Sequence, residues 1–107
     1  MSYKIMKLIC MFDLPVDTPK EQKAYRQFRT RLIKEGFTMM QYSVYIRTCP
    51  NREYTHKLER HIKKFVPQAG NIRLLTITEK QYNDMILLVG SKSQTERVIG
   101  DQRMIII

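Results

Sequence analysis

The sequence has few of the residues that build disulfide frameworks, membrane spans or phosphate-binding loops. Its 107 residues include two cysteines, Cys10 and Cys49, which are too few for a disulfide framework and predict a reducing, cytoplasmic setting. No apolar run approaches the roughly 18–20 residues that span a bilayer, and no signal peptide is recognisable, so we expect no membrane partner. The four glycines form no phosphate-binding loop, and the cysteines lack zinc-site spacing.

Acidic residues are scarce as well. Asp and Glu number 10 against 19 Lys and Arg, and the net charge is +9. In a small domain this excess predicts a polyanionic partner, most often nucleic acid; the alternative is a basic surface that only maintains solubility. The length suits one domain with a modest core, and the 43% content of hydrophobic residues argues against disorder.

The strongest pattern that is present is an apolar run over residues 5–12, interrupted only by Lys7. Its length and continuity predict a buried strand. Asp13 follows directly, and Leu14-Pro15 then turns the chain out of the strand, because proline has no amide proton for a ladder. A carboxylate held between a strand and a stiff turn suits a divalent metal. The other interpretation is that Asp13 simply begins the turn.

Capping residues and periodicity divide the rest of the chain. Thr18 and Glu21 form a capping box, Pro19 suits the first helical position, and Gly36 suits the position after the helix. The predicted elements are a helix over 19–35, strands over 37–41 and 43–48, a helix over 50–66, and strands over 72–78 and 85–89. The alternative for residues 37–48 is a single long bent strand. The first helical segment carries six positive and two negative side chains, and the second five and two. This concentration indicates an electrostatic footprint for nucleic acid.

The order of elements predicts an α+β fold, a ferredoxin-like βαββαβ domain with an extra C-terminal strand. We expect the domain over residues 1–90 and a C-terminal extension over 91–107, which ends in a short apolar strand, Met104–Ile107. An RNA-recognition module shares the order of elements. However, residues 41–46 lack the basic and glycine pattern of such modules, and the basic residues are on the helices.

In this fold both helices cover one face of the sheet and leave the other open. We expect that face to carry Met6, Leu8, Met39 and Tyr45. A homodimer packed through the two sheets would cover these apolar side chains, with the apolar tail pairing with the partner subunit.

Asp13 is the one aspartate of four that stands at the end of a strong strand. One carboxylate makes a poor magnesium site by itself. A two-fold axis that brought two copies of Asp13 together would make a credible Mg²⁺ clamp on a phosphate backbone, with the metal activating water or stabilising the leaving oxygen. Ser43 and two histidines on a helix give no basis for a Ser-His-Asp triad.

Four stretches together resemble a known family. They are Met11-Phe-Asp-Leu-Pro15, the helix from Lys23 to Gly36, Gln41-Tyr-Ser-Val-Tyr45, and the run from Gly70 to Tyr82. Over residues 1–90 the chain resembles the CRISPR-associated "Cas two" family of the spacer-acquisition module, also called the CRISPR-associated endoribonucleases. It is most similar to the versions found beside type II systems.

The resemblance implies a homodimer in which the two copies of Asp13, the catalytic and metal residue, hold Mg²⁺ across the interface. It implies a role in CRISPR adaptation: the dimer bridges two dimers of the Cas-one integrase and is a scaffold for double-stranded DNA before its insertion as a new spacer. The alternative is a magnesium-dependent endoribonuclease or endonuclease that uses the Asp13 pair, with single-stranded RNA as a further partner. In some systems integration does not need nuclease activity.

Some members of that family carry arginines directly after the aspartate, whereas this chain has Leu14, Pro15 and Val16. The grip on the nucleic-acid backbone must therefore come from elsewhere. We expect it from basic residues of the first helix and of one strand: Lys20, Lys23, Arg26, Arg29 and Arg47. For each of them the alternative is a solvated surface charge.

Overall fold

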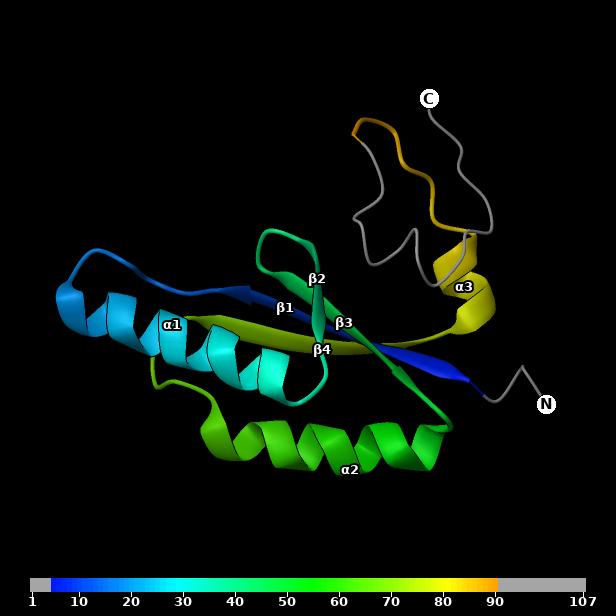
Figure 1. The fold of residues 1–107 in the computed structure, drawn as a ribbon, viewed down its shortest axis with the longest axis horizontal. Coiled ribbons are helices and arrows are strands. Elements are labelled where there is room, and N and C mark those ends of the chain that lie inside the picture. The colour runs from blue at the N-terminus through cyan, green and yellow to red at the C-terminus, as the bar shows by residue number, and fades with distance from the viewer. Residues whose placement is uncertain (1–4, 91–107) are drawn as a thin grey trace.

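The computed structural model describes residues 5–90, and the predicted α+β fold is confirmed over these residues (Figure 1). The elements in chain order are β1 (Met6–Asp13), α1 (Pro19–Lys34), β2 (Thr38–Gln41), β3 (Val44–Cys49), α2 (Arg52–Ile62), the 3-10 turn η2 (Lys63–Phe65), β4 (Asn71–Thr78) and α3 (Glu79–Asn83). Within the described residues, no helix has both the length and the apolar character needed to cross a membrane.

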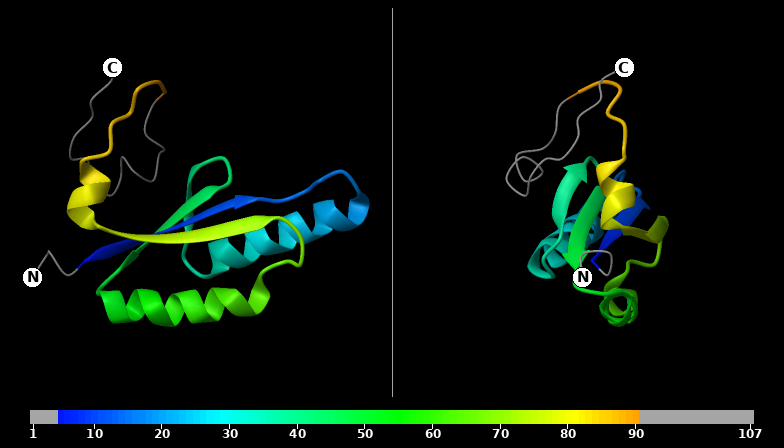
Figure 2. Two further views of the ribbon diagram at one scale, coloured as in Figure 1. Left: turned by 180° about the vertical axis from the view of Figure 1, so that it is seen from behind. Right: turned by 90° about the vertical axis from the view of Figure 1, so that its right-hand side faces the viewer.

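The four strands form one antiparallel sheet in the order β2-β3-β1-β4. Strand β1 is central, as its continuous apolar run predicts, and it pairs with β3 on one side and β4 on the other. Helices α1 and α2 lie side by side on one face of the sheet (Figures 1 and 2). This is the ferredoxin-like arrangement expected from the order of elements.

Helix α1 begins where the sequence predicts, because the capping box forms. Thr18 Oγ1 accepts a hydrogen bond from the Glu21 amide at 3.1 Å, and Glu21 Oε1 accepts one from the Thr18 amide at 3.0 Å. Helix α2 is capped in a similar way by Asn51, whose Oδ1 accepts from the Tyr54 amide at 2.8 Å. These caps fix the start of both helices relative to the strands that precede them.

The hydrophobic core lies between the sheet and the two helices. Alternate residues of β1, namely Leu8, Cys10 and Phe12, point toward the helices and are buried. They pack against side chains of α1, α2 and β3 in one cluster. That cluster also contains Phe28, Leu32, Phe37, Tyr45, Cys49, Leu58 and Ile62.

The prediction that Met6, Leu8 and Tyr45 lie on the open face is wrong. They belong to the helix-facing side of their strands, and each is at most 3% exposed. Met39 is opposite Tyr45 on the edge strand β2, so it too lies on the helix-facing side and not on the open face, but it is 42% exposed at the edge. The error has a physical reason: apart from Lys7, the run is apolar on both sides of the strand, so its pattern gives little indication of which side faces the core.

The open face carries the other set of β1 residues, Lys7, Ile9, Met11 and Asp13. Lys7 is buried on this side, where its Nζ donates to Thr48 Oγ1 at 2.7 Å and lies 4.9 Å from the centroid of the Tyr82 ring. Burial lowers the pKa of the Lys7 ammonium group. Through Tyr82, this lysine holds α3 against the open face.

The strand predicted over 85–89 is not formed. Residues 85–88 have no regular structure, and the apolar side chains of Met85, Ile86, Leu88 and Val89 are exposed. A strand needs a ladder partner for its amides and carbonyls, and the sheet of residues 5–90 does not pair with this segment. The predicted extension over 91–107, including the tail Met104–Ile107, lies outside the described residues.

Candidate functional site

Asp13 is the last residue of β1 and lies on the open face of the sheet, with an exposed side chain. It stands opposite Asn71, the first residue of β4, so the two side chains point to the same side. Leu14 and Pro15 then carry the chain away, as the sequence predicts. Within residues 5–90, the Asp13 carboxylate makes no hydrogen bond or ion pair, which leaves its oxygens available to a ligand.

Two backbone features fix the position of Asp13. On one side, the Phe12 amide donates to the Ser43 carbonyl at 3.0 Å, and Ser43 has φ +61°, in the left-handed region. On the other side, Gly70 has φ +97° and packs directly against the backbone of Asp13 and Leu14. The carboxylate therefore projects from a backbone that is restrained by both neighbouring strands.

The donor set around Asp13 fits magnesium only in part. Its carboxylate oxygens and the amide oxygen of Asn71 are hard ligands of the kind that Mg²⁺ takes. However, residues 5–90 contain no cluster of three or more His, Cys, Asp or Glu that could hold a metal ion. One copy of the chain thus offers one carboxylate, and a second copy would have to supply the other.

The basic residues predicted on the first helix all lie on α1 and are exposed: Lys20, Lys23, Arg26 and Arg29. Lys23 and Arg26 line a groove between α1 and residues 65–67, whereas Lys20 lines a separate hollow beside Leu14 and Pro15. Helix α1 buries only Phe28 and Leu32 fully. Most of its surface is therefore free to present positive charge.

Arg47 is placed differently from the other predicted basic residues. It lies on β3 and is half-buried, with its Nη2 donating to the Tyr54 hydroxyl at 2.6 Å and its guanidinium 4.9 Å from the centroid of the Tyr54 ring. A Cβ atom on Gly36 would be 3.2 Å from Arg47 Nε. The Arg47 guanidinium is thus already used in a contact with Tyr54 that joins β3 to α2.

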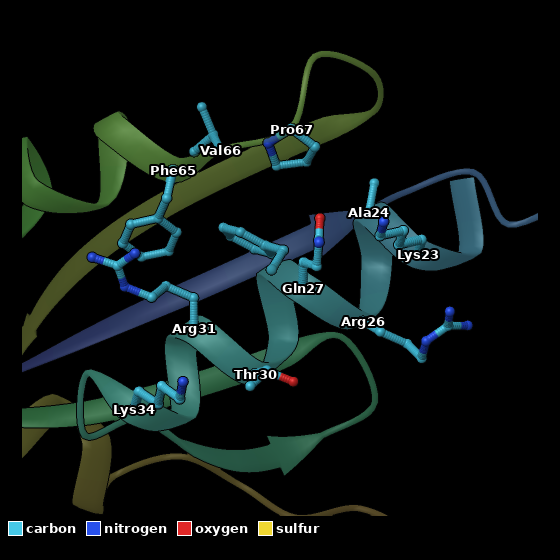
Figure 3. Close-up of a pocket in the computed structure, with 11 residues that line it drawn as sticks. Lys23, Ala24, Arg26, Gln27, Thr30, Arg31, Lys34, Phe65, Val66 and Pro67 are labelled. Atoms are coloured by element: carbon cyan, nitrogen blue, oxygen red, sulfur yellow. The ribbon is translucent and has the colours of Figure 1, made fainter. Parts of the chain in front are cut away.

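A groove of about 780 Å³ runs between α1 and the segment 65–67 that follows α2 (Figure 3). One wall is formed by Phe65, Val66 and Pro67, and the other by one face of α1. Of the described residues that line the groove, none is acidic and four are basic: Lys23, Arg26, Arg31 and Lys34. Arg31 and Lys34 are among the six positive side chains counted in the first helical segment, but the sequence did not show that they share a groove.

Arg31, which lines this groove, also forms a cluster with Glu35 and His61. Arg31 Nε donates to Glu35 Oε2 at 3.1 Å, and His61 Nε2 of α2 lies 3.0 Å from the same oxygen. The hydrogen bond with His61, together with that from Arg31, holds the pKa of the Glu35 carboxyl below its usual value of 4.5. The cluster joins the last turn of α1 to α2.

Neither cysteine is suited to chemistry. Cys10 is fully buried in the core, and burial raises the pKa of its thiol to about 12. Burial also raises the pKa of the Cys49 thiol, although Arg47 and Lys7 oppose that shift. Both thiols are free, and both are small core residues rather than nucleophiles.

The sequence over residues 6–85 matches the family described as CRISPR associated protein Cas2. The "CRISPR-associated endoribonuclease Cas2" of Ligilactobacillus salivarius is 46% identical over 101 residues, which covers 94% of this chain and 100% of the relative. The protein of the same name from Parvibaculum lavamentivorans is 50% identical over 92 residues, covering 83% and 88%.

A solved structure entitled "Crystal structure of cas2" has the same fold. Its TM-score to this chain is 0.57, its sequence identity is 19%, and the match covers 84% of this chain and 92% of that one. At this identity the likeness bears on the fold alone.

Proposed function

The chain belongs to the CRISPR-associated Cas2 family, and from this premise we propose that it is the dimeric scaffold that binds double-stranded DNA with the Cas-one integrase when new spacers are inserted into a CRISPR array. The observation that carries this proposal is the basic face of α1. Lys20, Lys23, Arg26 and Arg29 are all exposed around the side of this helix that turns away from the core, and several cations on one rigid helix can contact the phosphates of a duplex.

The open sheet face supports a homodimer. Leu75 of β4 lies on this face and is 47% exposed, although Ile9, its neighbour on β1, is buried. Separately from the sheet, the segment after α3 carries exposed apolar side chains at Ile86 and Leu88. A second copy packed against this face would cover such surface, and a dimer would also double the basic area offered to DNA.

A direct test is the affinity of the purified protein for duplex DNA as a function of salt, alone and with the integrase. The test variant replaces Lys20, Lys23, Arg26 and Arg29 by Gln. The matched control replaces Arg52, Lys57, Arg60 and Lys64, exposed on α2 and η2, by Gln. Each lost phosphate contact should reduce the slope of log affinity against log salt by about 0.9.

We expect the α1 variant to lose affinity at least tenfold with a shallower slope, and the control to lose much less. Equal losses in the two variants would mean that the total charge, and not the α1 face, binds the duplex. Wild-type protein without salt-sensitive affinity for duplex DNA, alone or with the integrase, would contradict the proposed function.

A second candidate function is a magnesium-dependent endonuclease or endoribonuclease. It is favoured by the Asp13 carboxylate, which is exposed and, within residues 5–90, unpartnered on the face where a second copy would pack. Two such carboxylates related by a two-fold axis would suit one Mg²⁺, which would supply electrostatic stabilisation of a scissile phosphate. Asp13→Asn should abolish Mg²⁺-dependent cleavage of RNA or DNA while duplex affinity stays within twofold of wild type. Unchanged cleavage in this variant would exclude Asp13 as the metal ligand.

A further inference from the structure

The groove between α1 and segment 65–67 has features that a duplex-binding surface does not need. Exposed cations on α1 suffice for contacts with the phosphates of a double helix. This groove adds an aromatic and apolar wall, Phe65 with Val66 and Pro67, facing the cationic helix (Figure 3). Its volume of about 780 Å³ lies within the range of roughly 300–1,000 Å³ typical of sites for small organic groups.

Arg31 is held in one orientation on the helical wall of this groove, beside Phe65. Its guanidinium lies over the Phe65 ring, 4.7 Å from the centroid, and its Nε is bonded to Glu35 at 3.1 Å. Glu35 is in turn fixed by His61 at 3.0 Å. Although it is held on both sides, the Arg31 side chain remains 45% exposed. A flat cation is therefore presented to solvent with its orientation already set.

Polar and charged groups surround this platform on the same helix. Gln27 lies one turn before Arg31, and its exposed amide points into the groove toward Pro67 (Figure 3). Lys23 and Lys34 line the two ends of the helical wall. An amide can form hydrogen bonds with the edge of a base, and the two ammonium groups can neutralise phosphates along the strand.

We propose that this groove is a binding site for an unpaired nucleic-acid strand, in which one base stacks on the Arg31 guanidinium and other parts of the strand's phosphate backbone lie near Lys23 and Lys34. Arginine planes and aromatic rings are the usual stacking surfaces for unpaired bases. Bases inside a duplex are already stacked on one another, so a duplex cannot use this platform. The site goes beyond the proposed duplex scaffold and lies on the helical side of the sheet, whereas Asp13 lies on the open face.

The test compares wild type with Arg31→Lys, which keeps the charge and can keep the ion pair with Glu35 but has no plane on which a base can stack. Arg60→Lys, at an exposed position on α2, is the matched control. Four fluorescent probes of equal length are titrated against each protein: a single-stranded DNA, a single-stranded RNA of the same sequence, an abasic strand and a duplex. Thermal unfolding of each variant is followed by circular dichroism to verify the fold.

We expect Arg31→Lys to weaken binding of at least one single-stranded probe by about fivefold or more, the loss of one stacked base. Its affinity for the abasic strand and the duplex should stay within twofold of wild type, and Arg60→Lys should change none of the four. Comparison of the DNA and RNA probes shows which sugar the site prefers. A loss of affinity for either probe in Arg31→Lys supports the proposed site.

Three results would overturn the inference. In the first, Arg31→Lys binds the single-stranded probes as tightly as wild type does. Another is an equal loss on all four probes, which would make Arg31 a general electrostatic contact. The third is wild-type protein that does not bind the single strands, which would leave the groove to another kind of partner. Duplex binding is measured in the same samples, so each of these results is distinguishable from failure of the duplex scaffold.

Discussion

A Cβ atom on Gly70 would lie 2.7 Å from the main-chain carbonyl oxygen of Asp13, closer than real Cβ atoms approach other atoms. Gly70 also has φ +97°, which side-chain-bearing residues rarely adopt. It directly precedes Asn71, the residue opposite Asp13 in the sheet. The position of the candidate metal ligand therefore depends on a glycine that is far away in the sequence.

This relationship predicts that Gly70→Ala is costly in two ways. The methyl group must push the Asp13 backbone away, so we expect the free energy of unfolding to fall by roughly 2–3 kcal/mol. Any cleavage that depends on Asp13 should be lost as well. Gly90→Ala is the control, because Gly90 has φ +114° but a Cβ atom there would lie at an ordinary contact distance of 3.9 Å from Leu87 Cδ1. Chemical denaturation of both variants measures the difference. If both variants lose the same free energy of unfolding, backbone strain alone, without the contact to Asp13, would explain why residue 70 is a glycine.

A second prediction concerns the cluster of Glu35, Arg31 and His61. The pKa of Glu35 is lowered in the folded state, so its contribution to stability is present above pH 4.5 and is lost as the pH falls through the lower folded value. Glu35→Gln should therefore lower the free energy of unfolding by roughly 0.5–1 kcal/mol at pH 7. The effect is modest because solvent screens the charges of these partly exposed groups. The difference between the urea midpoints of wild type and variant should shrink as the pH falls below 4.5. A difference that stays the same at every pH would show that packing, and not charge, is responsible.

The two cysteines give a third prediction. Because burial raises the pKa of both thiols, to about 12 for Cys10, they should resist alkylation by iodoacetamide at pH 8 in the folded protein. Mass spectrometry should find no label on the native chain and two labels after denaturation. Labelling of either thiol at the same rate before and after denaturation would contradict the burial described above.

The open sheet face leads to a fourth prediction. Leu75→Lys should place a charge in the proposed dimer interface, so light scattering should give one chain mass of 12.8 kDa where wild type gives twice that mass. Ile33→Lys is the matched control, since Ile33 is similarly exposed, at 45%, but lies on α1. Monomeric wild type, or dimers that tolerate the Leu75 variant, would show that the chains do not associate through this face.

The fold was predictable where local chemistry decides it. Thr18, Pro19 and Glu21 mark the start of α1, and the capping box forms as expected. The apolar run predicts the central strand, but only Lys7 indicated its orientation. Its ammonium group is accommodated on the open face by Thr48 and Tyr82, two contacts that lie far apart in the sequence.

The site was predictable only in part, for a related reason. Asp13 is recognisable because it ends a strong strand. In the sequence, Gly70 and Asn71 indicate only a turn. They become neighbours of Asp13 because β1 pairs with β4. The strand predicted over 85–89 has the right composition, but within residues 5–90 it has no ladder to join. Pairing is a property of the whole sheet, so residue patterns along one segment do not determine it.

The central claim, that the chain serves CRISPR adaptation as a DNA-binding scaffold, is tested most directly by spacer acquisition in cells. Wild type is compared with Asp13→Asn, and assembly with the integrase is verified in parallel. The scaffold account predicts that acquisition persists at the wild-type level when the complex is intact. Loss of acquisition in an intact complex would contradict it, and would make the chemistry of the Asp13 pair the centre of the mechanism.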